Sequence, residues 1–110
     1  MKYIINESRF NNIVNEYIDS TVGLPIKKHN HHSSFVNYVW FTNNKGELVF
    51  ESDDNGSGLE LGVRDDIWVS VKDMFSLSED ETNNRFSEWM GELYGVEFPG
   101  GVYTFEKSEF

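Results

Sequence analysis

Apolar residues recur with helical spacing at both ends of the chain, and polar residues fill the positions between them. Within residues 7–20 the spacing is i, i+3, i+4, i+7 and i+8, formed by Phe10, Ile13, Val14, Tyr17 and Ile18. Within residues 78–94 it is i, i+3, i+4 and i+7, formed by Phe86, Trp89, Met90 and Leu93. Each pattern is typical of one buried helix face. Ser78 with Glu81 can form a capping box, and Gly95 can supply the left-handed residue that ends the second helix.

A third helix is expected after residue 64. Asp65 and Asp66 would lie in its first turn, where the helix dipole favours acids. Its apolar face would consist of Ile67, Val71, Met74 and Phe75, with Trp68 close to the edge. The stretch 67–71, IWVSV, is also a good strand sequence, so helix and strand both stay open there.

Alternating and β-branched residues predict strands over residues 35–42, 47–51, 59–63 and 102–105, with a further short strand at 2–5. Residues 43–46 and 52–58 are expected to be turns, and residues 21–34 are expected to be a connection with breakers at Gly23 and Pro25. The strand at 35–42 is apolar on both faces, which favours a covered, central position. The order β-α-β-β-β-α-α-β predicts one α+β domain over residues 1–110, in which an antiparallel sheet of four or five strands packs against three helices.

Composition narrows the class of protein. The chain has 110 residues, and aromatic residues make up 15% of it, so large rings can build much of a single core. The absence of cysteine fits a reducing compartment. No apolar run approaches the ~20 residues of a membrane span, and residues 1–10 lack the apolar region of a signal peptide. We therefore expect a cytoplasmic protein with no membrane partner.

The charge is concentrated in the second half of the chain. The formal net charge is −10; residues 1–50 hold five basic and four acidic residues, whereas residues 51–110 hold four basic and fifteen acidic residues. Such a domain repels phosphate backbones, so direct nucleic-acid binding is not expected. A protein partner with a basic surface is the natural complement, and the alternative is that the charge only maintains solubility.

The candidate binding surface is the polar face of the helix at 78–94. It carries Glu79, Asp80, Glu88 and Glu92, and Asp65, Asp66 and Asp73 are possible additions. Acids on a rigid helix can copy the phosphate spacing of DNA and occupy a basic groove; the alternative is an ordinary solvated face. Trp68 and Tyr94 become aromatic anchors if they are exposed beside the acids.

Metal binding and catalysis have weaker support. The weak metal candidates are His29, His31 and His32, next to two lysines and with no third ligand fixed by spacing. Asp53, Asn55, Ser57 and Gly58 match the start of a calcium loop, but Arg64 stands where a bidentate Glu is needed, so an acidic hairpin turn is favoured. The sequence contains no phosphate-binding glycine loop and no serine nucleophile elbow. We expect no cofactor and no enzymatic activity.

The opening residues KYIINESRFNNIV resemble the start of small uncharacterised proteins encoded by tailed phages. The resemblance covers residues 2–14 and carries no functional motif. With the charge pattern, it suggests a small acidic, non-enzymatic protein-binding module, such as a phage-encoded inhibitor or nucleic-acid mimic acting in the host cytoplasm. Two alternatives stay open: a structural or oligomer-forming protein with an uncovered apolar patch around Trp40 or Trp68, and a small enzyme or metal-binding protein that uses the carboxylates or the histidine segment.

Overall fold

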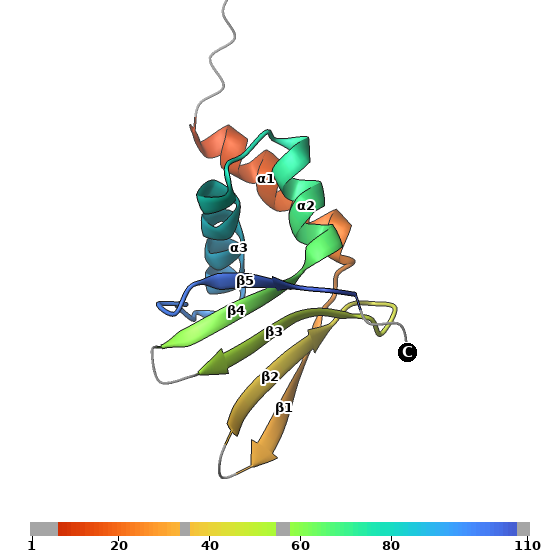
Figure 1. Cartoon of the computed structure of the whole chain (residues 1–110). Helices are drawn as coiled ribbons and strands as arrows, with labels where there is room; N and C mark the ends of the chain where they lie inside the picture. The colour runs from red at the N-terminus through yellow and green to blue at the C-terminus, as the bar shows by residue number, and fades with distance from the viewer. Residues whose placement is uncertain (1–6, 34–35, 55–57, 108–110) are drawn as a thin grey trace, which may run out of the picture.

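The computed structural model describes residues 7–33, 36–54 and 58–107, and in it the helices gather on one face of a sheet (Figure 1). The elements in chain order are α1 (Glu7–Val22), β1 (Lys27–Ser33), β2 (Val36–Thr42), β3 (Leu48–Asp54), β4 (Leu59–Arg64), α2 (Asp65–Met74), α3 (Glu79–Tyr94) and β5 (Val102–Phe105). The spatial order of the strands is β1-β2-β3-β4-β5. The β1–β2 end of the sheet projects away from the helices (Figure 1).

The predicted α+β fold class is confirmed, with one refinement of the sheet. Strands β1 to β4 form an antiparallel meander, whereas β5 pairs parallel to β4 after the chain has crossed over through α2 and α3. The sheet is therefore mixed. A parallel neighbour needs a long crossover, and the two consecutive helices supply it.

One predicted connection contains a strand. Residues 27–33, within the segment expected to be a connection, form β1 and pair along their whole length with β2. An edge strand can be held by backbone hydrogen bonds with little burial of its side chains. The polar sequence of β1 therefore carries no alternating apolar pattern that would predict a strand. Strand β2 is accordingly next to the edge, and not at the centre of the sheet. The strand expected at 2–5 lies outside the described residues.

The predicted start and end of α3 are confirmed. The Ser78 hydroxyl accepts from the Glu81 backbone N–H, and the Glu81 carboxylate accepts from the Ser78 N–H, as a capping box requires. Gly95 follows with φ of 68°, the left-handed conformation that glycine adopts without strain. For residues 67–71 the structure decides in favour of a helix, since Ile67 and Val71 are buried on one face of α2.

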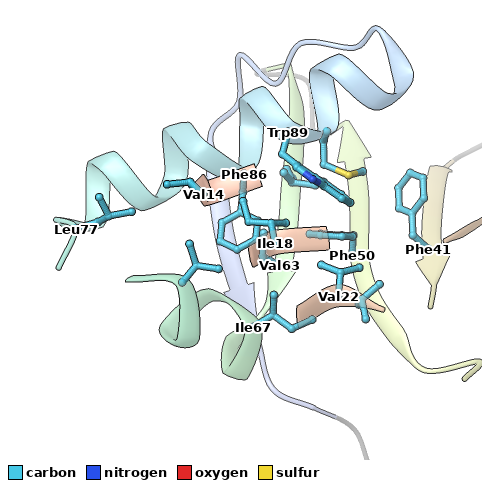
Figure 2. Packing of buried hydrophobic residues seen from close by; sticks show 14 residues of the cluster. Val14, Ile18, Val22, Phe41, Phe50, Val63, Ile67, Leu77, Phe86 and Trp89 are labelled. Atoms are coloured by element: carbon cyan, nitrogen blue, oxygen red, sulfur yellow. The ribbon is translucent and has the colours of Figure 1, made fainter. Parts of the chain in front are cut away.

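The core lies between the helices and the covered face of the sheet. In Figure 2, Phe50 of β3 and Phe86 of α3 point toward one another, with Ile18 of α1 beside them. The Phe50 ring centroid lies 6.2 Å from that of Phe86 and 5.5 Å from that of Trp89. Phe50, Phe86 and Ile18 are fully buried. Large rings thus supply much of the burial, as the composition suggested.

Three residues expected on buried helix faces are exposed instead: Ile13 at 40%, Met74 at 57% and Leu93 at 48%. Ile13 lies at the margin of the apolar stripe of α1, and Met74 is the last residue of α2. Leu93 lies within the stripe of α3, but in its last turn it borders a hollow that Asp19 and Leu24 also line. Helical spacing predicts the side of the helix on which a side chain lies. It does not predict whether a neighbouring helix or strand extends far enough along the helix to cover that side chain.

Candidate functional site

The polar face of α3 is exposed and unneutralised. Glu79, Asp80, Glu88 and Glu92 are all exposed, whereas Phe86 and Trp89 of the same helix are buried. The ion pairs among the described residues involve Arg64 and Lys107, and none reaches these four carboxylates. Arg85 is the only basic residue of α3, and its guanidinium donates to Asn11 Oδ1 and covers the Phe10 ring at 5.0 Å. The single basic side chain of α3 therefore contacts α1 and does not neutralise the α3 carboxylates.

The acids of α2 differ from one another. Asp66 accepts from Arg64 Nε at 2.6 Å and from the Ile67 backbone N–H at 2.9 Å, so its charge is compensated within the fold. Asp65 is half-buried, and Asp73 is exposed. Of the three, Asp73 most resembles the free carboxylates of α3.

The two predicted aromatic anchors are half-buried and held in place. The Trp68 indole N–H donates to Asn83 Oδ1 at 2.9 Å, which joins α2 to α3. The Tyr94 ring packs on Phe41 with centroids 5.0 Å apart, and burial raises the pKa of the Tyr94 hydroxyl. Both side chains tie elements together, and each leaves part of its ring accessible.

The structure contains a furrow between α1 and α3 that no sequence pattern predicted. We define the α1–α3 furrow as the hollow of about 230 Å³ lined by Asn15, Asp19, Leu24, Trp89, Glu92 and Leu93. Two of these lining residues are hydrogen-bonded to each other: the Trp89 indole N–H donates to Asp19 Oδ1 at 2.8 Å. This contact joins residues 70 positions apart, so no local pattern could reveal it.

Two further hollows adjoin the furrow. One, of about 400 Å³, shares Asp19 and Leu24 with it and continues past Glu16 to Asn44 in the turn between β2 and β3. The other, of about 500 Å³, shares Glu92 and lies between α3 and residues 95–98, where Glu88 and Glu97 add carboxylates. Each of the three hollows is therefore lined by at least two acidic residues.

The face of the sheet opposite the helices carries a second arrangement. One cross-strand row runs His29, Trp40, Glu51, Gly62 and Tyr103 in register from β1 to β5. The hydroxyls of Tyr38 and Tyr103 donate to the two oxygens of Glu51 at 2.5 and 2.6 Å. Burial first, and then the hydrogen bond to the Glu51 carboxylate, raise the pKa of both tyrosines well above the ordinary value.

Rings extend this row toward the edge strand. The Trp40 ring stacks on His29 with centroids 5.3 Å apart and on Tyr38 at 5.7 Å. The residues are half-buried. Since both Glu51 oxygens already accept hydrogen bonds, we interpret the network as support for the sheet. Only the pairing register, which the sequence does not disclose, brings its members together.

The metal candidates gain no support from the described part of the chain, which contains no group of three His, Cys, Asp or Glu able to hold an ion. The His29 imidazole Nε2 is hydrogen-bonded to Thr42 Oγ1 at 2.9 Å. His31 and His32 belong to β1, but their side chains lie outside the described residues, as do Asn55 and Ser57. Asp53 and Gly58 flank a connection between antiparallel strands, so the expected hairpin is confirmed.

No protein-family model, curated protein or solved structure matches this chain. Among the described residues no helix is both long and apolar enough to cross a membrane.

Proposed function

We propose that this protein is a non-enzymatic protein-binding module that docks on a basic surface of another protein through the carboxylates of α3. The observation that carries the proposal is the exposure of Glu79, Asp80, Glu88 and Glu92 on a helix whose only basic side chain is turned toward α1. Asp73 of α2 is a further exposed carboxylate and could add to this acidic surface.

The geometry of α3 supports such a role. Its buried ring-bearing face and its capping box hold the helix in a fixed position, so the carboxylates keep their spacing. Glu88 and Glu92 are one turn apart, and such a like-charged pair costs a few tenths of a kcal/mol in an isolated helix. Lysine or arginine from a partner would relieve that repulsion. A fixed array of negative charge is also what a mimic of a nucleic-acid backbone requires, and it would steer a basic protein toward the complex.

Capture from a cell lysate, followed by kinetics on the captured partner, tests the proposal. The bait variant is Glu79→Gln with Glu88→Gln, which removes two charges but keeps the length and helix preference of both side chains. The matched control is Asp54→Asn with Glu106→Gln, which removes the same charge from exposed positions outside α3.

The association rate with the purified partner should fall steeply as salt rises, and should fall in the α3 variant but not in the control. An association rate that is insensitive to salt, or equal in both variants, would remove the acidic surface from the function.

The open face of the sheet favours a second candidate, self-association. Helices cover only one face of the sheet (Figure 1), and the stacked rings of Trp40 and Tyr38 are half-buried on the other. Light scattering distinguishes the candidates, because a dimer that dissociates on Trp40→Ser substitution would support self-association. A monomer at high protein concentration would exclude it.

A further inference from the structure

We infer that the α1–α3 furrow receives a basic segment of the partner protein, in which an apolar side chain lies beside a lysine or arginine. The inference rests on the proposed function and deepens it. It places the centre of the contact with the partner at the C-terminal ends of α1 and α3. The remaining carboxylates of α3 then lie at the periphery of that contact.

The apolar part of the inference comes from two leucines. Leu24 is 38% exposed and Leu93 is 48% exposed, and both line the furrow together with Trp89, which is only 6% exposed. Protein interfaces commonly have such an apolar centre within a polar rim. An apolar side chain of the partner placed between Leu24 and Leu93 would remove both leucines, and itself, from water.

The charged part comes from the rim. Glu92 lines the furrow, Glu16 lines the adjoining hollow, and Asp19 lines both. Trp89 holds Asp19 by one carboxylate oxygen, and Asp19 has no basic partner among the described residues. A carboxylate that is oriented in this way is prepared to accept a hydrogen bond from a lysine or arginine. Charge complementarity therefore favours a basic segment as the occupant of the furrow. The exposed leucines favour a segment that also carries an apolar side chain.

Other exposed apolar residues do not offer the same combination. Val69 is 45% exposed and Met74 is 57% exposed, but both lie on α2, and none of the three hollows includes them. Val69 is therefore a suitable control position, with an exposure close to that of Leu93.

Two synthetic peptides of equal positive charge test the inference by nuclear magnetic resonance titration of the full chain. One contains lysine and leucine with amphipathic spacing, and the other has serine in place of each leucine. We expect the lysine–leucine peptide to bind more tightly and to shift the Trp89 indole N–H signal and the amide signals around Asp19 and Leu93.

Variants separate the apolar contribution from the charged one. Leu93→Ser should weaken the lysine–leucine peptide roughly tenfold, as expected for loss of a buried leucine contact, and leave the lysine–serine peptide unchanged. Val69→Ser should change neither. Asp19→Asn keeps an acceptor for Trp89 but removes the charge, and should weaken both peptides. Circular dichroism spectra that match the original protein ensure that each variant is folded.

The outcomes distinguish the inference from the function on which it rests. Equal binding of the two peptides with no effect of Leu93→Ser, but weakening by Glu79→Gln with Glu88→Gln, would overturn the furrow and leave the acidic surface standing. Signal shifts confined to Trp40 and Tyr103 on the open face of the sheet would overturn both. If Leu93→Ser weakens binding but neither salt nor the α3 charges matter, the furrow binds an apolar segment, and both the basic occupant and the charge-based function are wrong.

Discussion

The ring of Tyr103 lies against the backbone of Gly62 on the open face of the sheet. A Cβ atom at position 62 would lie 2.7 Å from Tyr103 Cζ and 2.7 Å from Glu51 Cγ. Gly62 is paired with both residues, Glu51 on β3 and Tyr103 on β5. The missing side chain is therefore what lets the tyrosine hydroxyl reach the carboxylate across β4.

Gly62→Ala should consequently destabilise the protein, although glycine is usually unfavourable in a strand. The added methyl group must displace Tyr103 or Glu51, and overpacking of this kind costs about 1–3 kcal/mol. Urea unfolding followed by circular dichroism measures the loss. Thr104→Ala, at the exposed neighbour on β5, should stay within ~0.5 kcal/mol of the original protein. A Gly62→Ala variant that is as stable as the original would show that the ring does not need this space.

The helices could be predicted from the sequence because their signals are local. The capping box at Ser78 and Glu81, the left-handed Gly95 and the stripe through Phe86 and Trp89 all lie within a few turns, and each is confirmed. The same reasoning failed at Leu93, whose environment depends on where α1 ends and on the position of Leu24. Local spacing carries no information about that neighbour.

The sheet shows the same limit more strongly. Strand β1 is polar and lies at an edge, so neither alternation nor apolar content distinguished it from a loop. The contact of Trp89 with Asp19 and the row through Glu51 both depend on residues brought together from distant parts of the chain. The exposure of the α3 acids was predictable, because charged side chains are almost never fully buried unless they are paired.

Phe86→Ala and Leu93→Ala should differ sharply in stability, although both residues share one apolar stripe in the sequence. Phe86 is fully buried against Phe50, so its truncation leaves a cavity and should cost about 3–5 kcal/mol. Leu93 is half exposed, and its truncation should cost well under ~1.5 kcal/mol. Urea midpoints of the two variants give the comparison. Equal losses would mean that Leu93 is packed as the sequence pattern suggested.

Ser78→Ala should destabilise the protein through the first turn of α3. The Ser78 hydroxyl satisfies the backbone N–H of Glu81, and loss of such a cap typically costs about 0.5–2 kcal/mol. Ser78→Asp keeps an acceptor at the same position and should retain most of the stability. Thermal unfolding of the two variants checks the prediction. If both variants lose the same stability, the hydrogen bond is not the source of the effect.

The tyrosine pair on the open face of the sheet should make the protein sensitive to alkali. The folded protein raises the pKa of Tyr38 and Tyr103, so the unfolded chain releases these protons first as the pH rises. Their contribution to stability is complete below pH ~10, the ordinary tyrosine pKa, and is lost progressively above it. Urea midpoints should therefore fall above that pH, and fall less in the variant Tyr38→Phe with Tyr103→Phe.

Titration of tyrosine absorbance gives a second measurement of the same effect. In the folded protein, Tyr38 and Tyr103 should ionise later than an ordinary tyrosine. Glu51→Gln removes the charge and weakens the acceptor, but burial is the largest cause of both shifts. The two tyrosines of that variant should therefore ionise earlier than in the original protein and still above pH ~10. Ionisation of every tyrosine near the ordinary pKa, without unfolding, would contradict the half-buried Tyr38–Glu51–Tyr103 arrangement.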